Sequence, residues 1–480
     1  MSDNKEKKGF RLWHAVLAAV VLLVITFSSY TVFRAVSFKK TQTASELSPE
    51  QSYELTQRLL ESYPEKYQTL KKLSYNISEP QLDIWAKSAI LIDVSNGNVL
   101  YHKNADAIIP PASMTKLFSM YVVEEEIAAG RFSYNQIIPL PPESWACNMP
   151  PHSSLMFLGK GQRVTMEELL LGLSICSGND AAYALAYTVS GTMDAFVERM
   201  NLVAQDLGLV NTHFVESSGY SEENQTTARE MAEFAAIYLR RHPDSLHRFH
   251  SVLDFTYPKE RNLAPGDKLQ AQNFTQGLPQ KITMPVTQAN TNPLLGKLSG
   301  CDGLKTGYID ESGYNLALTA VRGQTRFLSV TMGGPGNNAR EGQAGRIHDG
   351  TELMEWAFKN FADYSLELKV HSYLVRSFNA SEKMIRLIPA YTDKTFTVPY
   401  VTGASMEENL QSVKVDVQLP DFCWGSVEQG SVQGKIVISA GGYILEEIPL
   451  LADRNLKKGN VLSALSDLIL KTYVIKIKSK

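Results

Sequence analysis

The sequence contains few cysteines: its 480 residues include only four. Small secreted domains that depend on disulfides carry a much higher proportion, so this chain must be stabilised by hydrophobic cores instead. We expect buried, free thiols, with disulfide pairing after export as the alternative. The four residues are Cys147, Cys176, Cys301 and Cys423.

The sequence also lacks a strong charge excess and the common ligand-binding motifs. A net charge of −3 creates no field that would attract nucleic acid. Histidines and cysteines are nowhere spaced as in metal sites, and there is neither a glycine-rich phosphate loop nor an internal repeat. We therefore expect no metal, no cofactor and no nucleic-acid partner.

One long apolar run without Asp, Glu, Lys or Arg extends from Leu12 to Phe33. As a helix it would be about 33 Å long, enough to cross the ~30 Å hydrocarbon core of a bilayer. We interpret it as an uncleaved signal anchor, because a cleaved signal peptide usually has a shorter apolar region and an Ala-x-Ala-like site. Positive residues before the run favour a cytoplasmic N-terminus.

The segment Ser113-Met-Thr-Lys116 opens a stretch with helical composition that ends at Gly130. Residues three apart lie on one face of a helix, so the Lys116 amine can reach the Ser113 hydroxyl. A serine hydroxyl is a weak nucleophile until a base removes its proton, and a desolvated lysine can be that base. Two other Ser-x-x-Lys matches occur in polar terminal segments, so this motif alone is weak evidence.

Two further motifs follow in order. Ser177-Gly-Asn179 interrupts a helical pattern that begins with a Thr165-x-x-Glu168 capping box. We expect Ser177 to face Lys116 and Asn179 to offer its amide to a substrate; a plain helix cap is the alternative. Lys305-Thr306-Gly307 lies in an expected strand, where glycine would let a substrate backbone lie against the edge.

Ser-x-x-Lys, Ser-x-Asn and Lys-Thr-Gly in this order are the motif set of penicillin-binding proteins and serine β-lactamases. The chain resembles one family in particular, the low-molecular-mass D-alanyl-D-alanine carboxypeptidases, or DD-peptidases. This resemblance is strong over roughly residues 82 to 361 and weaker beyond. It also rests on five segments: Ser88–Asp93, Gly178–Ala182, Asn211–Phe214, Thr227–Glu230 and Cys301–Gly307.

The resemblance implies a serine-type carboxypeptidase that removes the terminal D-alanine from peptidoglycan stem peptides through a Ser113 acyl-enzyme. β-Lactams should acylate the same serine as substrate mimics. Lys116 would be the general base, with Ser177, Asn179 and Lys305 completing the catalytic set. Lys305 and the Thr306 hydroxyl would hold the substrate carboxylate, since charge-assisted hydrogen bonds suit that group.

Other site residues come from the resemblance alone. The backbone N–H groups of Ser113 and Tyr308 would form the oxyanion hole, which requires two donors. Arg229 and Arg326 occupy places where the family carries arginines near the substrate carboxylate. For both arginines, an ordinary surface position is the alternative.

Three other functions remain open at this stage. A β-lactamase of the same fold would need an added glutamate for deacylation, and we cannot place one in the sequence. A DD-endopeptidase acting on cross-links is closer to the leading hypothesis. A non-catalytic peptidoglycan-binding scaffold is a third possibility, although every motif residue is present.

The order of helices and strands predicts an α/β (α+β) catalytic domain with a mainly antiparallel sheet and flanking helices, and the resemblance implies a DD-peptidase-like fold with a helical subdomain. Asn96-Gly97 predicts a type I′ hairpin turn, and a second capping box starts at Thr227. A long closing helix is expected over 338–361. We expect the acidic run at 124–126 to face solvent.

The expected organisation has five parts. Residues 1–36 form a cytoplasmic tail and membrane anchor, 37–81 a polar, partly helical linker, and 82–362 the catalytic domain. A small β-rich domain follows over 363–458, with strand-like segments at 366–375, 412–417 and 434–439. The basic amphipathic tail at 459–480 is either a surface anchor or a segment docked on that domain. The expected location is the bacterial cytoplasmic membrane, with the catalytic domain on its outer face.

Overall fold

The computed structural model describes residues 16, 20–22, 24–26, 70–399 and 405–478. It contains two compact units. The larger comprises Gln68–Tyr364 and Thr395–Gln411, so it extends beyond the boundary expected at residue 362. The smaller includes Ser365–Lys394 and Ser412–Lys480.

A six-stranded sheet forms the centre of the larger unit, with the strand order β1-β3-β2-β10-β9-β8. Its pairs are antiparallel except β1 with β3, which confirms the predicted mainly antiparallel sheet. The strands are β1 (Lys71–Lys72), β2 (Ser88–Asp93), β3 (Asn98–Lys103), β8 (Cys301–Ile309), β9 (Gly313–Arg322) and β10 (Thr325–Gly334). Two short sheets add β4 (Ile137–Ile138) with β5 (Val164–Thr165), and β6 (Asp254–Tyr257) with β7 (Val286–Ala289).

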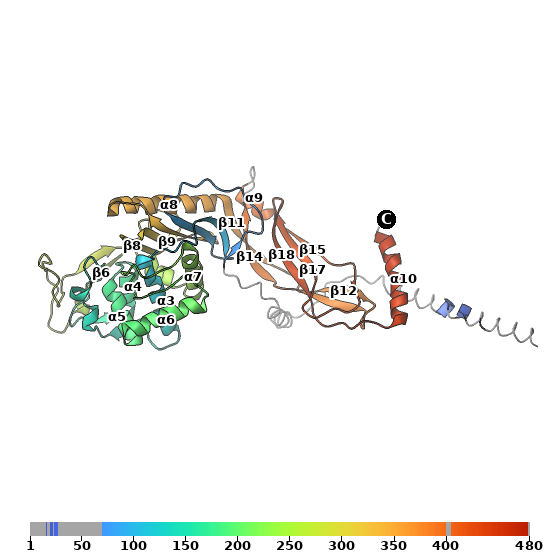
Figure 1. Cartoon of the computed structure of the whole chain (residues 1–480), viewed down its shortest axis with the longest axis horizontal. Helices are drawn as coiled ribbons and strands as arrows, with labels where there is room; N and C mark the ends of the chain where they lie inside the picture. Colours follow the sequence, from blue (N-terminus) through green and yellow to red (C-terminus); the bar gives the residue numbers. More distant parts are fainter. Residues whose placement is uncertain (1–15, 17–19, 23, 27–69, 400–404, 479–480) are drawn as a thin grey trace, which may run out of the picture. The chain divides into compact units, whose positions relative to one another are not determined.

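Helices cover both faces of this sheet (Figure 1). The larger unit contains α3 (Thr115–Ala128), α4 (Met166–Ser174), α5 (Asn179–Ser190), α6 (Met193–Asp206), α7 (Ala228–Arg241), α8 (Ala339–Asn360) and α9 (Met406–Gln411). Short 3₁₀ turns are η2 (Ala112–Met114), η3 (Pro142–Ser144), η4 (Ala146–Asn148) and η6 (Glu260–Asn262), and η5 (Leu246–His250) is a π-helix.

Alternation along β2 explains the two layers. Ile90 and Ile92 belong to the core that contains α3 to α7, whereas Ala89 and Leu91 pack in the core under α8. Successive strand residues point to opposite faces, and all of β2 is buried, which is why residues 89–92 form a continuous apolar run instead of alternating with polar residues. The expected closing helix is α8.

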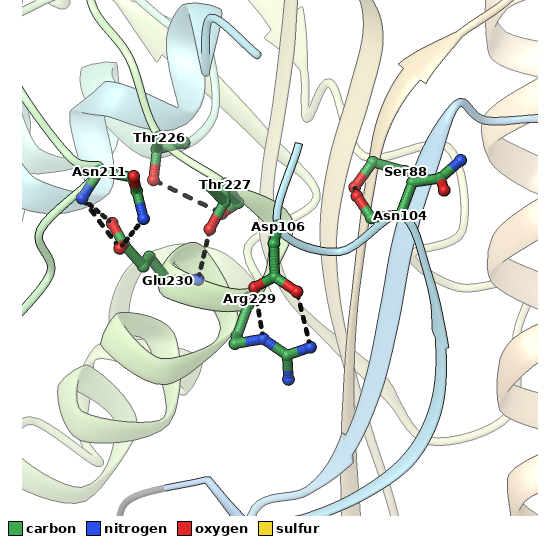
Figure 2. Close-up of polar contacts among 8 residues, drawn as sticks. All are labelled: Ser88, Asn104, Asp106, Asn211, Thr226, Thr227, Arg229 and Glu230. Atoms are coloured by element: carbon green, nitrogen blue, oxygen red, sulfur yellow. Dashed lines mark hydrogen bonds and ion pairs between the residues drawn. The ribbon is translucent and has the colours of Figure 1, made fainter. Parts of the chain in front are cut away.

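Of the two capping boxes predicted from the sequence, one forms completely and the other in part. Thr165 and Glu168 form the predicted reciprocal capping box before α4. At α7 only half of the predicted box forms: the Thr227 side chain accepts from the Glu230 N–H at 3.1 Å. The Glu230 carboxylate instead accepts from the Asn211 N–H and side chain (Figure 2). A tertiary contact therefore replaces the second half of a local motif.

The hairpin between β2 and β3 forms, but the predicted type I′ turn is wrong. Residues 94–97 connect the strands, and of Asn96 and Gly97 only the glycine has positive φ, whereas a type I′ turn needs two such residues. The Asp93 carboxylate accepts from the Ser95 N–H at 2.9 Å and the Asn96 amide at 2.8 Å. These bonds stabilise a longer turn.

The acidic run at 124–126 is not a solvated face, which corrects our expectation. Glu124 and Glu126 are only 2% and 3% exposed. Glu126 pairs with Arg131 and Arg199. The Glu124 carboxylate accepts from two hydroxyl groups, that of Tyr238 at 2.7 Å and that of Ser245. Both of these partners are neutral. Burial raises the pKa of the Glu124 carboxyl to about 7.

Glu124→Gln is expected to change how stability depends on pH. Because the folded-state pKa lies above the ordinary value of 4.5, the unfolded chain releases this proton first as the pH rises. Wild-type stability should therefore fall between about pH 4.5 and 7, by about 3 kcal/mol in all, and the variant should lack this fall. Melting temperatures of both proteins at pH 4.5, 6 and 8 measure it. Glu125→Gln is the control, and parallel curves for Glu124→Gln and wild type would contradict the prediction.

The smaller unit is β-rich, as predicted. Its six-stranded sheet has the order β15-β17-β18-β13-β12-β16. The strands are β12 (Tyr373–Phe378), β13 (Met384–Pro389), β15 (Lys414–Gln418), β16 (Cys423–Trp424), β17 (Val432–Ala440) and β18 (Tyr443–Ala452). The segment 366–375, expected as one strand, is split between β12 and β11 (Phe361–Glu367), which pairs with β14 (Asp393–Pro399).

The C-terminal segment forms helix α10 (Val461–Lys478). Val461, Leu465, Leu468 and Ile469 are exposed on it. Within the described ranges, no helix combines the length and apolarity needed to cross a bilayer. Most of the predicted anchor at 12–33, and residues 37–69 of the linker expected over 37–81, lie outside the described residues. The rest of that expected linker contains β1, which pairs with β3 in the central sheet.

All four cysteines are free, which confirms the expectation of free thiols. Cys176 and Cys423 are buried, whereas Cys147 and Cys301 are partly exposed, so complete burial applies to only two of them. Burial raises the pKa of the Cys176 thiol to about 12.

Candidate active site

Ser113 and Lys116 lie on consecutive turns at the start of α3. Ser113 is in the short η2 turn, and Lys116 is in the first turn of the helix. The Lys116 Nζ donates to Ser113 Oγ at 3.0 Å. Ser113 is half-buried, whereas Lys116 is fully buried. A partly exposed hydroxyl is thus hydrogen-bonded to an amine that is buried away from water.

Lys116 makes two further hydrogen bonds, to Asn179 Oδ1 at 2.8 Å and to the Ser218 carbonyl at 2.6 Å. Burial lowers its pKa to about 7, while the carboxylates of Glu216 and Asp180 oppose this shift. Near neutral pH a large fraction of Lys116 is therefore unprotonated. An unprotonated amine at this distance can accept the Ser113 proton.

Ser177 lies in the turn between α4 and α5, and Asn179 is the first residue of α5. The N-cap of α5 is Gly178, with no side-chain cap bond, so Ser177 and Asn179 are not simple capping residues. Ser177 has a φ of 55°, which is uncommon for a residue with a side chain. The Asn179 amide contacts Lys116 through its oxygen and donates to Ser153 Oγ at 3.1 Å.

Asp180 supports this turn from below and is fully buried. Its carboxylate accepts from the N–H groups of Met156 at 2.8 Å and Leu158 at 2.9 Å. It thereby links the start of α5 to residues 156–158. Sequence reasoning missed this residue, although an acidic group in the first turn of a buried helix was a usable signal.

Lys305 lies on β8 and is also buried, with 1% exposure. Its Nζ donates to Ser177 Oγ at 2.9 Å and to the Thr306 carbonyl at 3.1 Å. Burial lowers the pKa of Lys305 well below its ordinary value, and the nearby charges of Lys116 and Arg346 lower it further. Ser177 thus contacts Lys305, and Lys116 contacts Asn179, so the three motifs meet in one site.

The three residues after Lys305 have separate environments. The Thr306 hydroxyl bonds Thr291 Oγ1 at 2.8 Å. A Cβ on Gly307 would lie 2.4 Å from the Pro111 carbonyl, so the glycine allows β8 to pack directly against the turn that carries Ser113. Tyr308 is 45% exposed and stacks on Tyr314 with ring centroids 4.3 Å apart.

A cleft of about 740 Å³ opens over this cluster, and its lining includes Ser113, Asn179, Gly219, Tyr220 and Tyr308. That volume is within the range of small-molecule and peptide sites. The cleft therefore exposes the Ser113 hydroxyl to a ligand, whereas Lys116 and Lys305 are buried behind its lining residues.

The two predicted arginines are not brought to the cleft. Arg229 forms a two-bond ion pair with Asp106, with distances of 2.6 and 3.0 Å (Figure 2). Arg326 does the same with Asp302 at 2.9 and 2.8 Å. Neither lines the cleft. Arg346, which we did not single out, is buried and donates to the Gly307 carbonyl at 2.6 Å.

Comparisons of the sequence and of the structure with known proteins point to the same family. The model of a family described as D-alanyl-D-alanine carboxypeptidase matches residues 74–336. The D-alanyl-D-alanine carboxypeptidase DacA of Escherichia coli is 30% identical over 405 residues, which cover 81% of this chain and 88% of the relative. For DacF of Bacillus subtilis the identity is 29% over 382 residues, or 79% and 88% of the two chains. The crystal structure of penicillin binding protein 5 from Haemophilus influenzae superposes with a TM-score of 0.63 at 29% identity, covering 80% of this chain and all of that one.

Proposed function

The chain belongs to the D-alanyl-D-alanine carboxypeptidase family, and we propose that it is the serine hydrolase that removes the terminal D-alanine from peptidoglycan stem peptides through an acyl-enzyme on Ser113. The observation that carries this assignment is the 3.0 Å bond between Lys116 Nζ and Ser113 Oγ at the floor of the cleft. A nucleophile bonded to a base that titrates near neutrality is the arrangement that acyl transfer requires.

In the proposed reaction, unprotonated Lys116 takes the Ser113 proton as Ser113 Oγ attacks the carbonyl carbon between the last two D-alanines. The backbone N–H groups of Ser113 and Tyr308 stabilise the oxyanion. The proton then passes to the leaving nitrogen as the C–N bond breaks and D-alanine departs. Water then attacks the acyl-enzyme carbonyl and loses its proton to Lys116. As the ester C–O bond breaks, Lys116 passes this proton to Ser113 Oγ, which restores the serine hydroxyl and the neutral amine and releases the shortened peptide. β-Lactams react at the same serine.

The other motif residues position the substrate in this proposal. Lys305 and Thr306 hold the terminal carboxylate, and Ser177, bonded to Lys305, lies beside it. Asn179 fixes Lys116 through its oxygen and can offer its amide hydrogens to the peptide. Arg229 and Arg326 are omitted from this set because their guanidinium groups are paired with carboxylates elsewhere.

We also propose that the protein is held at the outer face of the bacterial cytoplasmic membrane. Its substrate is part of the cell wall, which lies outside that membrane. The apolar run at 12–33 is long enough to anchor it. In this proposal the exposed apolar residues of α10 make a second contact, with the membrane surface.

The direct test is release of D-alanine from a pentapeptide ending in D-Ala–D-Ala, and we expect multiple turnovers. Amidation of the terminal carboxylate should lower kcat/KM by roughly 10- to 150-fold, because it removes a charge-assisted bond to Lys305. Lys305→Gln should lower kcat/KM for the free acid much more than for the amide. Equal losses would refute the carboxylate role of Lys305. Binding of the peptide without D-alanine release over hours would refute the carboxypeptidase assignment.

A further inference from the structure

Glu216 lies in the loop that precedes α7, and its carboxylate is the centre of a dense set of hydrogen bonds. One oxygen accepts from the Ser218 N–H at 2.7 Å and the Ser218 hydroxyl at 2.6 Å. The other accepts from the N–H groups of Gly219 at 2.5 Å and Tyr220 at 2.9 Å. The Asn224 amide adds a further bond at 3.0 Å. The carboxylate thus defines the shape of the loop around it.

The same loop is the wall of the active site behind Lys116. The Ser218 carbonyl accepts from Lys116 Nζ at 2.6 Å. A Cβ on Gly219 would lie 1.8 Å from the Ala112 carbonyl, so the loop packs directly against the turn that bears Ser113. Asn224 also donates to Thr115 Oγ1 at 3.2 Å. A shift of this loop would therefore move an acceptor of the amine and the support of the nucleophile together.

We propose that Glu216 is a positioning residue of this active site: it holds the Ser218 carbonyl against Lys116 and, through its charge, sets the pH range in which Lys116 serves as a base. This inference rests on the proposed function of Lys116. It assigns Glu216 no contact with substrate, because the carboxylate faces the loop backbone and does not line the cleft.

The charges around Lys116 determine the direction of the effect. Two carboxylates, Glu216 and Asp180, raise its pKa, and burial lowers it. Lys305 is the nearby cation, and the contacts of Lys116 with Asn179 and Ser218 are neutral. Once the Glu216 charge is removed, burial and the Lys305 charge still lower the pKa of Lys116, and Asp180 is the carboxylate that remains to raise it. The pKa of Lys116 should then fall, and the unprotonated form should appear at lower pH.

The experiment measures the second-order rate constant for acylation by a labelled penicillin between pH 5 and 9. In wild type the rate should rise through a limb near pH 7 as Lys116 loses its proton. In Glu216→Gln we expect this limb to move about one unit towards lower pH, because an opposing charge is lost. The plateau should fall several-fold, because the carboxamide cannot accept all of the loop N–H groups.

Two variants separate charge from loop geometry. Glu216→Asp keeps the charge but shortens the side chain. The plateau of its acylation rate at high pH should therefore fall, whereas the pH at which the rate rises should stay near the wild-type value. Glu223→Gln removes an equal charge from an exposed position of the same loop and should leave both limb and plateau unchanged. Circular dichroism and melting temperature report on folding, and Glu216→Asp still tests the loop role if Glu216→Gln does not fold.

The inference fails if wild type is acylated normally and the limb of folded Glu216→Gln does not move, or moves to higher pH. It also fails if Glu216→Asp keeps the wild-type plateau. These outcomes would leave the proposed function intact. If wild type itself is not acylated by penicillin and releases no D-alanine, the proposed function fails first.

Discussion

Ser113→Ala is expected to abolish labelling by penicillin and to lower kcat/KM for D-alanine release by roughly five orders of magnitude or more. Ser113 Oγ is the atom that forms the ester bond of the acyl-enzyme, and it lies in the cleft within hydrogen-bond distance of Lys116 Nζ, whose pKa is about 7. The two lysines and Asn179 remain in the variant, but without a nucleophile they can only bind the substrate.

Labelled penicillin followed by denaturing electrophoresis measures this effect directly. Ser113→Cys is the matched control: it retains a nucleophile at the same position and should keep some acylation. Peptide mapping of the labelled wild type should place the adduct on the segment that contains Ser113. Labelling of Ser113→Ala as strong as that of wild type would show that the nucleophile is another residue.

Lys116→Met should lower the acylation rate by roughly 10²- to 10⁴-fold, the usual contribution of a general base. Methionine has a similar length but no amine, so it cannot accept the Ser113 proton. The limb near pH 7 in the rate profile should also disappear, because the group that titrates there is removed. Rate against pH, measured with labelled penicillin, gives both quantities.

Lys116→Arg provides a second check, since a guanidinium stays protonated and should be as inactive as methionine. Lys297→Met, which removes an exposed lysine, is the control for a general effect of charge. Melting temperatures are needed because both changes at position 116 leave Asn179 Oδ1 and the Ser218 carbonyl with altered partners. A limb that persists at the same pH in folded Lys116→Met would mean that another group titrates there.

Several features of this protein could be predicted from local sequence. The three-residue spacing of Ser113 and Lys116 brings them together in any helical turn, whatever surrounds it. The cap at Thr165 likewise depends on neighbours in the chain. The expected sheet and closing helix followed from such patterns and agree with the structure.

Patterns that depend on distant partners were predicted less well. The acidic run at 124–126 had the composition of a solvated face, but Tyr238 and Arg199 from other helices cover two of its carboxylates. At Glu230 a local capping motif competes with Asn211, and the tertiary contact prevails. The arginine positions were inferred from resemblance alone; in the structure Arg229 pairs with Asp106 and Arg326 with Asp302, and neither arginine lines the cleft.

The sequence by itself determined the chemistry of the site: a serine, its lysine and two further motifs, each recognisable from side chains a few positions apart. Only the tertiary structure decided how that chemistry is tuned. The pKa of Lys116 depends on burial and on Glu216 and Asp180, which are far from it in the chain. Desolvation and Coulomb interactions act through space, so a residue's reactivity follows from the groups that folding places around it.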